Sequence, residues 1–211
     1  MSNYTAIEEI GTTISNLLWA QISETQDVLP PNSTRDFIVL GSPADIEEDD
    51  NVLCLFLYQV TENTHMKNQE MQKITSNRLR YPPLTLDLYY MLTSHAGKKY
   101  KQNRTEMTAQ EHIRLGRAMQ ILHDNPILPI EHSLPPDNET DIRDELRITL
   151  HPISLDDMTK IWTTFQGKSY RPCACYLVSP VKIDSQRDRD VRRVVRKETD
   201  SDHMVPKREE G

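Results

Sequence analysis

The feature that most restricts the fold is the segment LTLDLYYMLT at residues 84–93. Side chains of an extended chain alternate between its two faces, so this period of two predicts a β-strand. One face is apolar and consists of Leu84, Leu86, Leu88, Tyr90 and Leu92. The other mixes polar and apolar groups, namely Thr85, Asp87, Tyr89, Met91 and Thr93. We expect the second face to be covered by the protein's own helices, with Asp87 as a satisfied polar contact inside that layer.

The remaining segments predict an α+β fold in which a mixed sheet is flanked by helices. Apolar residues at helical spacing predict helices over about residues 4–22, 109–124 and 155–166. Apolar or alternating runs predict further strands at 37–40, 52–58, 145–153 and 173–183. Thr108 and Glu111 form a capping-box pattern before the second helix, and Ser154 with Asp157 gives a capping signal for the third. Residues 61–83 are expected to be irregular.

Composition favours a protein of a reducing compartment. The 211 residues carry a net charge of −7 and a pI near 5.5, which oppose a nucleic-acid binder that works by bulk electrostatics. The three cysteines do not form a disulfide framework. The longest strongly apolar run, Val52–Tyr58, is too short to span a bilayer, and the first residues show no signal-peptide pattern. We expect a cytoplasmic protein without a membrane or nucleic-acid partner, unless dedicated machinery carries it out.

The chain changes character at Asp184. Residues 1–183 hold every predicted element and form one domain, whereas 184–211 lack aromatic residues and are rich in charge. Such a segment cannot bury enough apolar area to offset the entropy of ordering it. We expect a charged, flexible tail that is free or a frayed helix, with ordering against a partner as the alternative.

No pattern of catalytic or metal-binding residues emerges. Gly167-Lys168-Ser169 resembles the end of a phosphate-binding loop, but Trp162 stands where that loop needs glycine, which favours a helix C-cap instead. The histidines are scattered along the chain. Cys173 and Cys175 have no second pair, so buried packing explains them better than a metal does.

Asp87 and Asp144 could act as an acid–base pair, but nothing in the sequence links them. A strand carboxylate more commonly pairs with an arginine, here Arg78, Arg80 or Arg171. We therefore expect no enzymatic activity, no metal and no cofactor.

Four segments together resemble a known family. They are NVLCLFLYQVTENTHMKN, RYPPLTLDLYYMLTSHA, EHIRLGRAMQILHDNPILP and LRITLHPISLDDMTKIWTTFQGKSYRPCACYLVSPVKI. In this order and spacing they are similar to the tail-terminator, or cap, proteins of phage-tail-like contractile injection systems of the antifeeding-prophage type. The similarity extends over roughly residues 4–183. The common sequence name of the family is a domain of unknown function, so the functional label comes from members found in such particles.

The resemblance implies a structural role. Members form a hexameric ring on the end of the tail tube distal to the baseplate, contact the last tube and sheath subunits, and stop elongation. Their fold is similar to that of the terminators of long-tailed phages, a mixed sheet flanked by helices. For this chain the resemblance implies a homohexamer, tube and sheath protein as partners, and no cofactor. It also implies assembly in the cytoplasm into a particle that some systems release.

Charge and apolar patterns indicate three candidate contact regions. A basic loop, expected to meet an acidic rim of the tube protein or a neighbour's Glu47–Asp50, contains Lys98, Lys99, Lys101 and Arg104. The polar stretch 61–80 carries apolar residues of the kind that mark docking surfaces, namely Met66, Met71, Ile74 and Leu79, and we single out the two methionines as contact candidates. The tail offers cations for sheath or tube carboxylates, among them Arg187, Arg189, Arg192 and Arg193.

Three other functions stay open at this point. A baseplate or tube-initiator adaptor of the same particle would share every bulk property. An enzyme with an unrecognised site would show a deep pocket with convergent titratable groups, whereas a flat surface would count against it. A nucleic-acid adaptor that uses the arginines of 187–197 would bind DNA in a steeply salt-dependent way.

Overall fold

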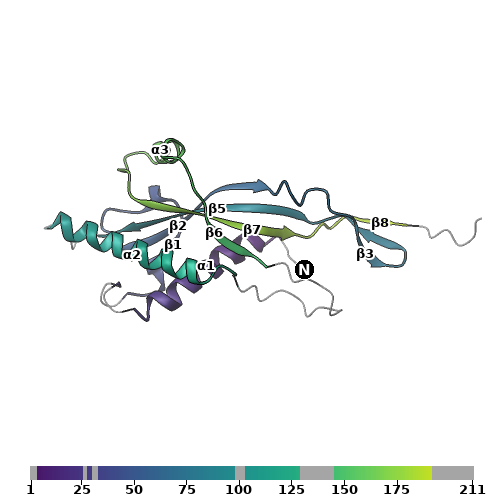
Figure 1. The fold of residues 1–211 in the computed structure, drawn as a ribbon, viewed down its shortest axis with the longest axis horizontal. Coiled ribbons are helices and arrows are strands. Elements are labelled where there is room, and N and C mark those ends of the chain that lie inside the picture. Colours follow the sequence, from purple (N-terminus) through teal and green to yellow (C-terminus); the bar gives the residue numbers. More distant parts are fainter. Residues whose placement is uncertain (1–3, 26–27, 30–32, 98–102, 129–144, 192–211) are drawn as a thin grey trace, which may run out of the picture. The chain divides into compact units, whose positions relative to one another are not determined.

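The computed structural model describes residues 4–25, 28–29, 33–97, 103–128 and 145–191 (Figure 1). The chain divides into two compact units, and each is described by itself. The main unit comprises Met1–Gln69 and Pro83–Asp184, and the small unit comprises Glu70–Pro82 and Ser185–Gly211.

The described part of the main unit is built around a five-stranded sheet. The strands follow the order β1 (Ile38–Leu40), β2 (Val52–Glu62), β5 (Leu84–His95), β7 (Cys173–Ile183) and β6 (Arg147–Leu150). The sheet is mixed, because β1 runs parallel to β2 whereas the other neighbours are antiparallel. The segment LTLDLYYMLT therefore lies in the central strand, where both faces need cover.

Helices cover both faces of this sheet. The helices α1 (Ala6–Ile22) and α2 (Arg104–Asp124) lie on one side and α3 (Leu155–Thr163) on the other (Figure 1). The side chains of Leu88 and Leu92 belong to the large core beneath α1 and α2. Met91, from the opposite face of β5, packs with Met158 and Trp162 of α3. Both faces of β5 are thus covered around Leu88–Leu92, whereas Leu84 at the start of the strand is 46% exposed. The predicted α+β fold is confirmed.

The small unit has a sheet of its own. The strands β3 (Gln72–Thr75), β4 (Arg78–Arg80) and β8 (Asp188–Asp190) lie side by side in that order, and both pairs are antiparallel. The prediction of an irregular stretch at 61–83 is wrong, because β2 extends to Glu62 and β3 and β4 follow it. β8 lies within the predicted tail, so residues 188–190 of that tail pair in a sheet. The rest, 192–211, lies outside the described residues, and the boundary at residue 184 stays a prediction.

Helix boundaries show where capping patterns succeed and fail. Ser154 caps α3 as predicted, since its Oγ accepts a hydrogen bond of 3.1 Å from the amide of Asp157. The capping box of Thr108 and Glu111 is wrong, because α2 already begins at Arg104. Its cap is Asn103, whose Oδ1 accepts from two amides of the first turn at 3.2 and 3.4 Å. Two short 3-10 turns, Arg35–Phe37 and Pro43–Asp45, flank β1.

Candidate partner-binding surfaces

The end of β5 is fastened to α2 by a buried carboxylate. Glu111 is only 7% exposed, and its Oε1 accepts a hydrogen bond of 3.0 Å from the amide of Ala96. The same oxygen pairs with the Nη1 of Arg171, whose chain segment precedes β7. A buried carboxylate needs such partners because its charge has lost the solvation of water. Glu111 therefore ties three parts of the main unit together at one point.

A second buried charge strengthens the same end. Arg114, one turn after Glu111 and 1% exposed, donates from Nε to the carbonyl of Val28 at 3.1 Å. Its Nη1 donates to the side chain of Asn51 and, at 3.4 Å, to the carbonyl of His95. Its guanidinium also lies over the ring of Phe37, 5.5 Å from the centroid. One arginine thus holds several loops against the end of the sheet.

The acidic segment 45–50 lies beside the same end of β5. A Cβ atom added to Gly97 would meet the carbonyl oxygen of Asp49 at 2.2 Å, so the two backbones touch. The ammonium group of Lys168 donates a hydrogen bond to the carbonyl of Ile46 and thereby also holds the segment. The acidic segment is therefore fixed next to the point where the chain enters the predicted basic loop.

The basic loop itself is only partly described. Lys98, Lys99 and Lys101 lie outside the described residues. Arg104 is exposed and forms the first residue of α2. Both anchors of the loop are well defined, since Gly97 packs against the acidic segment and Asn103 caps the helix.

His95 is a buried titratable group at this end. It is hydrogen-bonded through Nε2 to Thr93 Oγ1 at 3.0 Å. Burial lowers its pKa to about 4, and the nearby positive charges of Arg171 and Lys168 add to the effect. The imidazole is therefore neutral at physiological pH. Its role is packing and hydrogen bonding, and it adds no cation to the surface.

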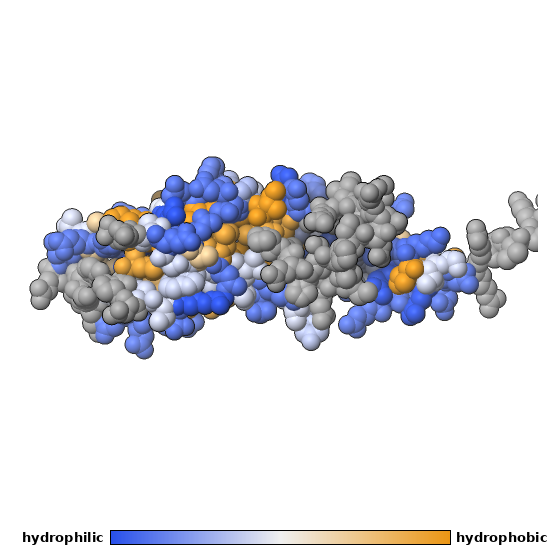
Figure 2. Space-filling model, turned by 90° about the horizontal axis from the view of Figure 1, so that it is seen from below, coloured by the Kyte–Doolittle hydropathy of each residue, from blue (hydrophilic) through white to orange (hydrophobic). Residues whose placement is uncertain are grey.

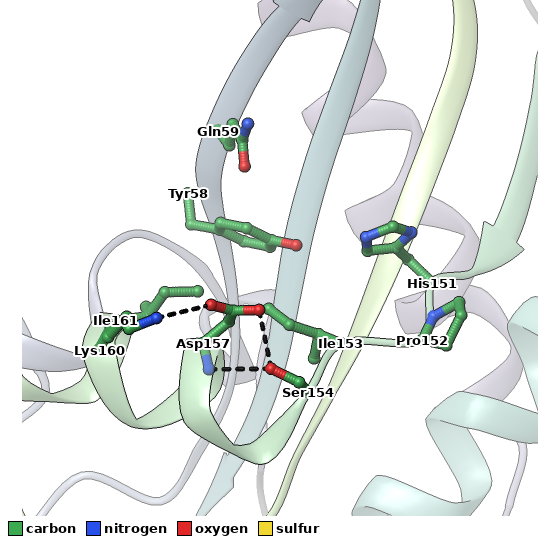
Figure 3. Close-up of a pocket in the computed structure, with 9 residues that line it drawn as sticks. All are labelled: Tyr58, Gln59, His151, Pro152, Ile153, Ser154, Asp157, Lys160 and Ile161. Atoms are coloured by element: carbon green, nitrogen blue, oxygen red, sulfur yellow. Dashed lines mark hydrogen bonds and ion pairs between the residues drawn. The ribbon is translucent and has the colours of Figure 1, made fainter.

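An open groove of about 490 Å³ runs between α3, β2 and the segment that follows β6 (Figure 3). Ser154, His151 and Asp157 line it, and these are the residue types of a hydrolytic triad. Their hydrogen bonds serve another purpose: Ser154 Oγ donates to Asp157 Oδ2 at 2.7 Å while it caps the helix. His151 contacts the ring of Tyr89 edge to face, with the centroids 5.1 Å apart. The groove thus presents helix capping and aromatic packing in place of an activated nucleophile.

The remaining charges of the groove also pair with each other. Lys160 contacts Asp156 at 2.7 Å and Asp157 at 3.1 Å on the exposed side of α3. Burial raises the pKa of Tyr58, which keeps its hydroxyl protonated. Surface pairs of this kind stabilise a helix only weakly, and Asp157 and Lys160, which both line the groove, pair with each other.

Asp87 is a structural residue, as predicted, although it pairs with none of the expected arginines. Its Oδ1 accepts hydrogen bonds from Asn63 Nδ2 at 2.8 Å and from Ser179 Oγ. Asn63 is itself buried and accepts from two backbone amides of the turn that follows β2. Arg171 pairs with Glu111, and Arg78 and Arg80 pair with Asp188.

The other predicted contact residues are spread over both units. Met66 in the main unit and Met71 in the small unit are each half-buried. Arg187 and Arg189 are exposed beside and within β8, and Arg192 and Arg193 lie outside the described residues. Within the small unit, Arg187 and Arg189 are two positions apart in the chain.

Sequence reasoning missed the buried charges Glu111 and Arg114. Both lie on the stripe of α2 that also buries Ala118, Ile121 and Leu122. Charged residues in register with an apolar stripe are the signal that could have found them, because a buried charge needs a partner. Cys173 and Cys175 behave as predicted: they pack beneath α3, and burial raises the pKa of Cys175 to about 11.

Two kinds of feature are absent from the described residues. These residues contain no group of three or more His, Cys, Asp or Glu side chains that could hold a metal ion. None of the described helices combines the length and the apolar character that crossing a membrane requires.

The family model of the Pvc16 N-terminal domain matches residues 9–197. The chain belongs to this family. The resemblance to terminators stated from the sequence is thereby confirmed at the level of the family. No curated protein matches the chain.

Two solved structures share the fold of this Pvc16 N-terminal domain. One is the sheath/tube terminator of the PVC extracellular contractile injection system in the extended state, with a TM-score of 0.60 and 16% identity. The other is the tube-terminating cap of the anti-feeding prophage, with a TM-score of 0.61 and 16% identity. The matches cover 97% and 91% of this chain but 66% and 60% of those chains. This chain therefore spans about two thirds of the length of the structures that it resembles.

Proposed function

We propose that this protein is a structural terminator of a contractile injection system. It would sit as a ring on the baseplate-distal end of the tube and sheath and stop their elongation. The observation that carries this proposal is the fold, which matches a sheath/tube terminator along nearly the whole chain and accompanies membership of the Pvc16 N-terminal domain family. Both similar structures are terminators or caps, which supports this role over that of a baseplate adaptor.

The function needs shape and fixed contacts, and no chemistry. A subunit of a closed ring carries two different surfaces that fit each other, so it exposes more apolar area than a monomer needs. Figure 2 shows apolar side chains grouped among polar ones on the side of α1 and α2. Ile113 of α2 is 49% exposed, and Ile7 and Leu17 of α1 are only partly covered. We infer a homohexamer in which this side contributes to subunit contacts.

The partners in this proposal are further copies of the chain, the tube protein and the sheath protein. The basic loop with Lys98, Lys99, Lys101 and Arg104 would contact an acidic rim. The anchoring by Glu111, Arg114 and Gly97 supports this assignment, because a contact loop works best on a rigid base. Met66 and Met71 would add apolar contact area. Assembly in the cytoplasm and a place in the finished particle follow from the same role.

A deletion strain tests the role directly. Electron microscopy of particles from such a strain should show tubes or sheaths of variable length without finished ends. Re-expression of the protein should restore a uniform length. Particles of uniform length with completed ends in the deletion strain would refute the proposal, and label at the baseplate end would favour the adaptor instead.

The loop assignment has its own test. Reversal of Lys98, Lys99 and Lys101 to glutamate should abolish sheathed particles or change their length, because three attractions become repulsions. The control reverses three exposed cations of the main unit that lie outside the candidate contact regions, Arg35, Arg147 and Lys160. It gives the same change in net charge and should leave the particles unaltered. Normal particles from the loop variant would exclude this loop as a contact.

A further inference from the structure

The register of the small sheet separates its charges by face. Residues directly opposite each other on neighbouring strands share a face of the sheet. One row across the three strands is Gln72, Arg80 and Asp188, and another is Thr75, Arg78 and Asp190. We call the side on which these two rows lie the Asp188 face. The row between them points the other way and consists of Lys73, Leu79 and Arg189.

The Asp188 face neutralises its own charges. Asp188 is half-buried and forms ion pairs with Arg78 at 2.8 Å and with Arg80 at 3.2 Å. Asp190 stands opposite Arg78 in the ladder. The two acidic residues of the described strands β3, β4 and β8 therefore both lie on this face, next to its two arginines.

The opposite side, which we call the Leu79 face, keeps its positive charges. It carries Lys73 and Arg189, both exposed, on either side of the half-buried Leu79. Arg187, two residues before Arg189, lies over the ring of Tyr81 at 4.5 Å from the centroid. Stacking holds the guanidinium plane in place while its N–H donors stay available in the plane of the group. The face thus combines three cations with apolar groups, and no acidic residue of the described strands lies on it.

We infer that the Leu79 face binds an acidic, partly apolar segment of a partner protein. The charge of the face decides the sign of the partner, since carboxylates pair with arginine in a favourable planar geometry. Arg187 and Arg189 are two positions apart, which is about 6.6 Å along a strand. A partner segment in extended conformation places the side chains of every second residue at the same spacing. Carboxylates at alternate positions would therefore meet both arginines.

A protein partner fits this face better than nucleic acid does. Leu79 lies between Lys73 and Arg189, and the ring of Tyr81 lies against Arg187. Both offer apolar area that a phosphate backbone would leave uncovered. The chain as a whole carries a net charge of −7, which repels a polyanion at long range. A short acidic segment experiences less of that repulsion, because it engages the local cations within a Debye length.

Fluorescence anisotropy with the purified full-length chain tests the inference. The probe is a short labelled peptide of alternating Glu and Val at low ionic strength, with a Lys-Val peptide of the same length as the negative probe. The wild type should bind the Glu-Val peptide and not the Lys-Val peptide. The triple variant K73E/R187E/R189E should bind the Glu-Val peptide at least about tenfold more weakly, as expected from the loss of three surface charge pairs.

The control variant is K67E/R147E/K160E, which has the same net charge as the triple variant but leaves the small unit intact. It should bind the Glu-Val peptide like the wild type. Equal weakening in both variants, or no binding by the wild type, would overturn the inference. A third outcome would also overturn the inference, in favour of a nucleic-acid site. In that outcome the wild type binds a labelled oligothymidylate more tightly than the Glu-Val peptide, and the triple variant no longer binds the oligothymidylate.

One measurement and one further variant separate the loss of charge from the loss of the small sheet. Protection of the Tyr81 amide from hydrogen exchange, in each variant, reports whether the small sheet is still formed, because that amide donates to the carbonyl of Arg187 at 3.0 Å. If the charge reversals melt the sheet, K73Q/R187Q/R189Q removes the charges more gently and should still weaken binding. The assay uses no particles, so its failure would leave the proposed terminator role standing, and failure of the deletion-strain test would leave this surface standing.

Discussion

At the scale of single residues, the buried charges of Glu111 and Arg114 hold the end of β5 against α2 and the neighbouring loops. A threonine three positions before a glutamate is a common helix start, so the pattern at Thr108 predicted a cap. The helix instead begins earlier, and Glu111 accepts from the amide of Ala96, which is distant in the sequence. A local motif cannot report such a partner, because the contact exists only after the sheet and α2 have packed.

Substitution by alanine should change stability in opposite directions at the two glycines Gly97 and Gly116. In G97A the new methyl group would lie 2.2 Å from the carbonyl oxygen of Asp49. Because this oxygen belongs to the backbone, the clash can be relieved only if the chain itself shifts. We expect a loss of about 2 kcal/mol in the free energy of unfolding, in the range of overpacked sites. In G116A nothing lies within 4 Å of the new atom in the interior of α2, so stability should rise by about 0.5–1 kcal/mol. Urea unfolding measures both, and equal effects of the two substitutions would contradict the close contact.

His95 predicts a pH dependence of stability with a definite sign. Its pKa is lowered from 6.5 to about 4 in the fold, so between these values the unfolded chain binds more protons than the folded one. Stability should therefore fall as the pH drops from about 6.5 toward 4, by at most about 1.4 kcal/mol per pH unit. Below the folded pKa this contribution becomes constant.

The variant H95Q provides the comparison, because it does not titrate and can still hydrogen-bond Thr93. Denaturant midpoints measured from pH 7 to pH 4 should fall less steeply for H95Q than for the wild type. All other titratable groups are the same in both proteins, so their contributions cancel in the difference. Parallel slopes would show that His95 is not buried as a neutral group.

At the scale of elements, helices and strands could be predicted where the informative pattern lies within a single segment of the sequence. The alternation at 84–93 gave β5 and the two chemical characters of its faces, and the serine before α3 gave the start of that helix. The small sheet could not be predicted in this way. β4 and β8 are short and polar, and their pairing joins Arg80 to Asp188, which are 108 positions apart. Their stability depends on that long-range pairing, which no window of sequence reveals.

The ion pairs of Asp188 should contribute to the stability of the small sheet. Its carboxylate pairs with two arginines of β4 and is only 15% exposed, so D188N should weaken the sheet by about 1 kcal/mol. Exchange of the Tyr81 amide should then accelerate by about fivefold. D190N is the matched control, because Asp190 is exposed and lies on the same strand and face. Faster exchange in D190N than in D188N would mean that the ion pairs do not hold the strands.

At the scale of the whole molecule, the sequence predicted the fold class and the family, and the family model and the similar solved structures agree. Candidate contacts were harder to predict, because a docking surface is defined by side chains that converge in space. Arg187 and Arg189 illustrate this. The sequence showed only a basic stretch, whereas the register with β4 shows which neighbouring charges are already neutralised.

The division into two units predicts that the main unit folds without the small unit. Both apolar cores consist of residues of the main unit, and none of their described members comes from 70–82 or from the segment after Asp184. The test variant ends at Asp184 and carries a Gly/Ser segment of equal length in place of residues 70–82. We expect it to fold with a melting temperature within about 3 °C of that of the wild type. Hydrophobic burial supplies most of the stability, and this variant keeps it. The same variant should lose the Glu-Val peptide binding. A large fall in melting temperature, measured by circular dichroism, would mean that the small unit belongs to the folding core, which the composition of the two cores argues against.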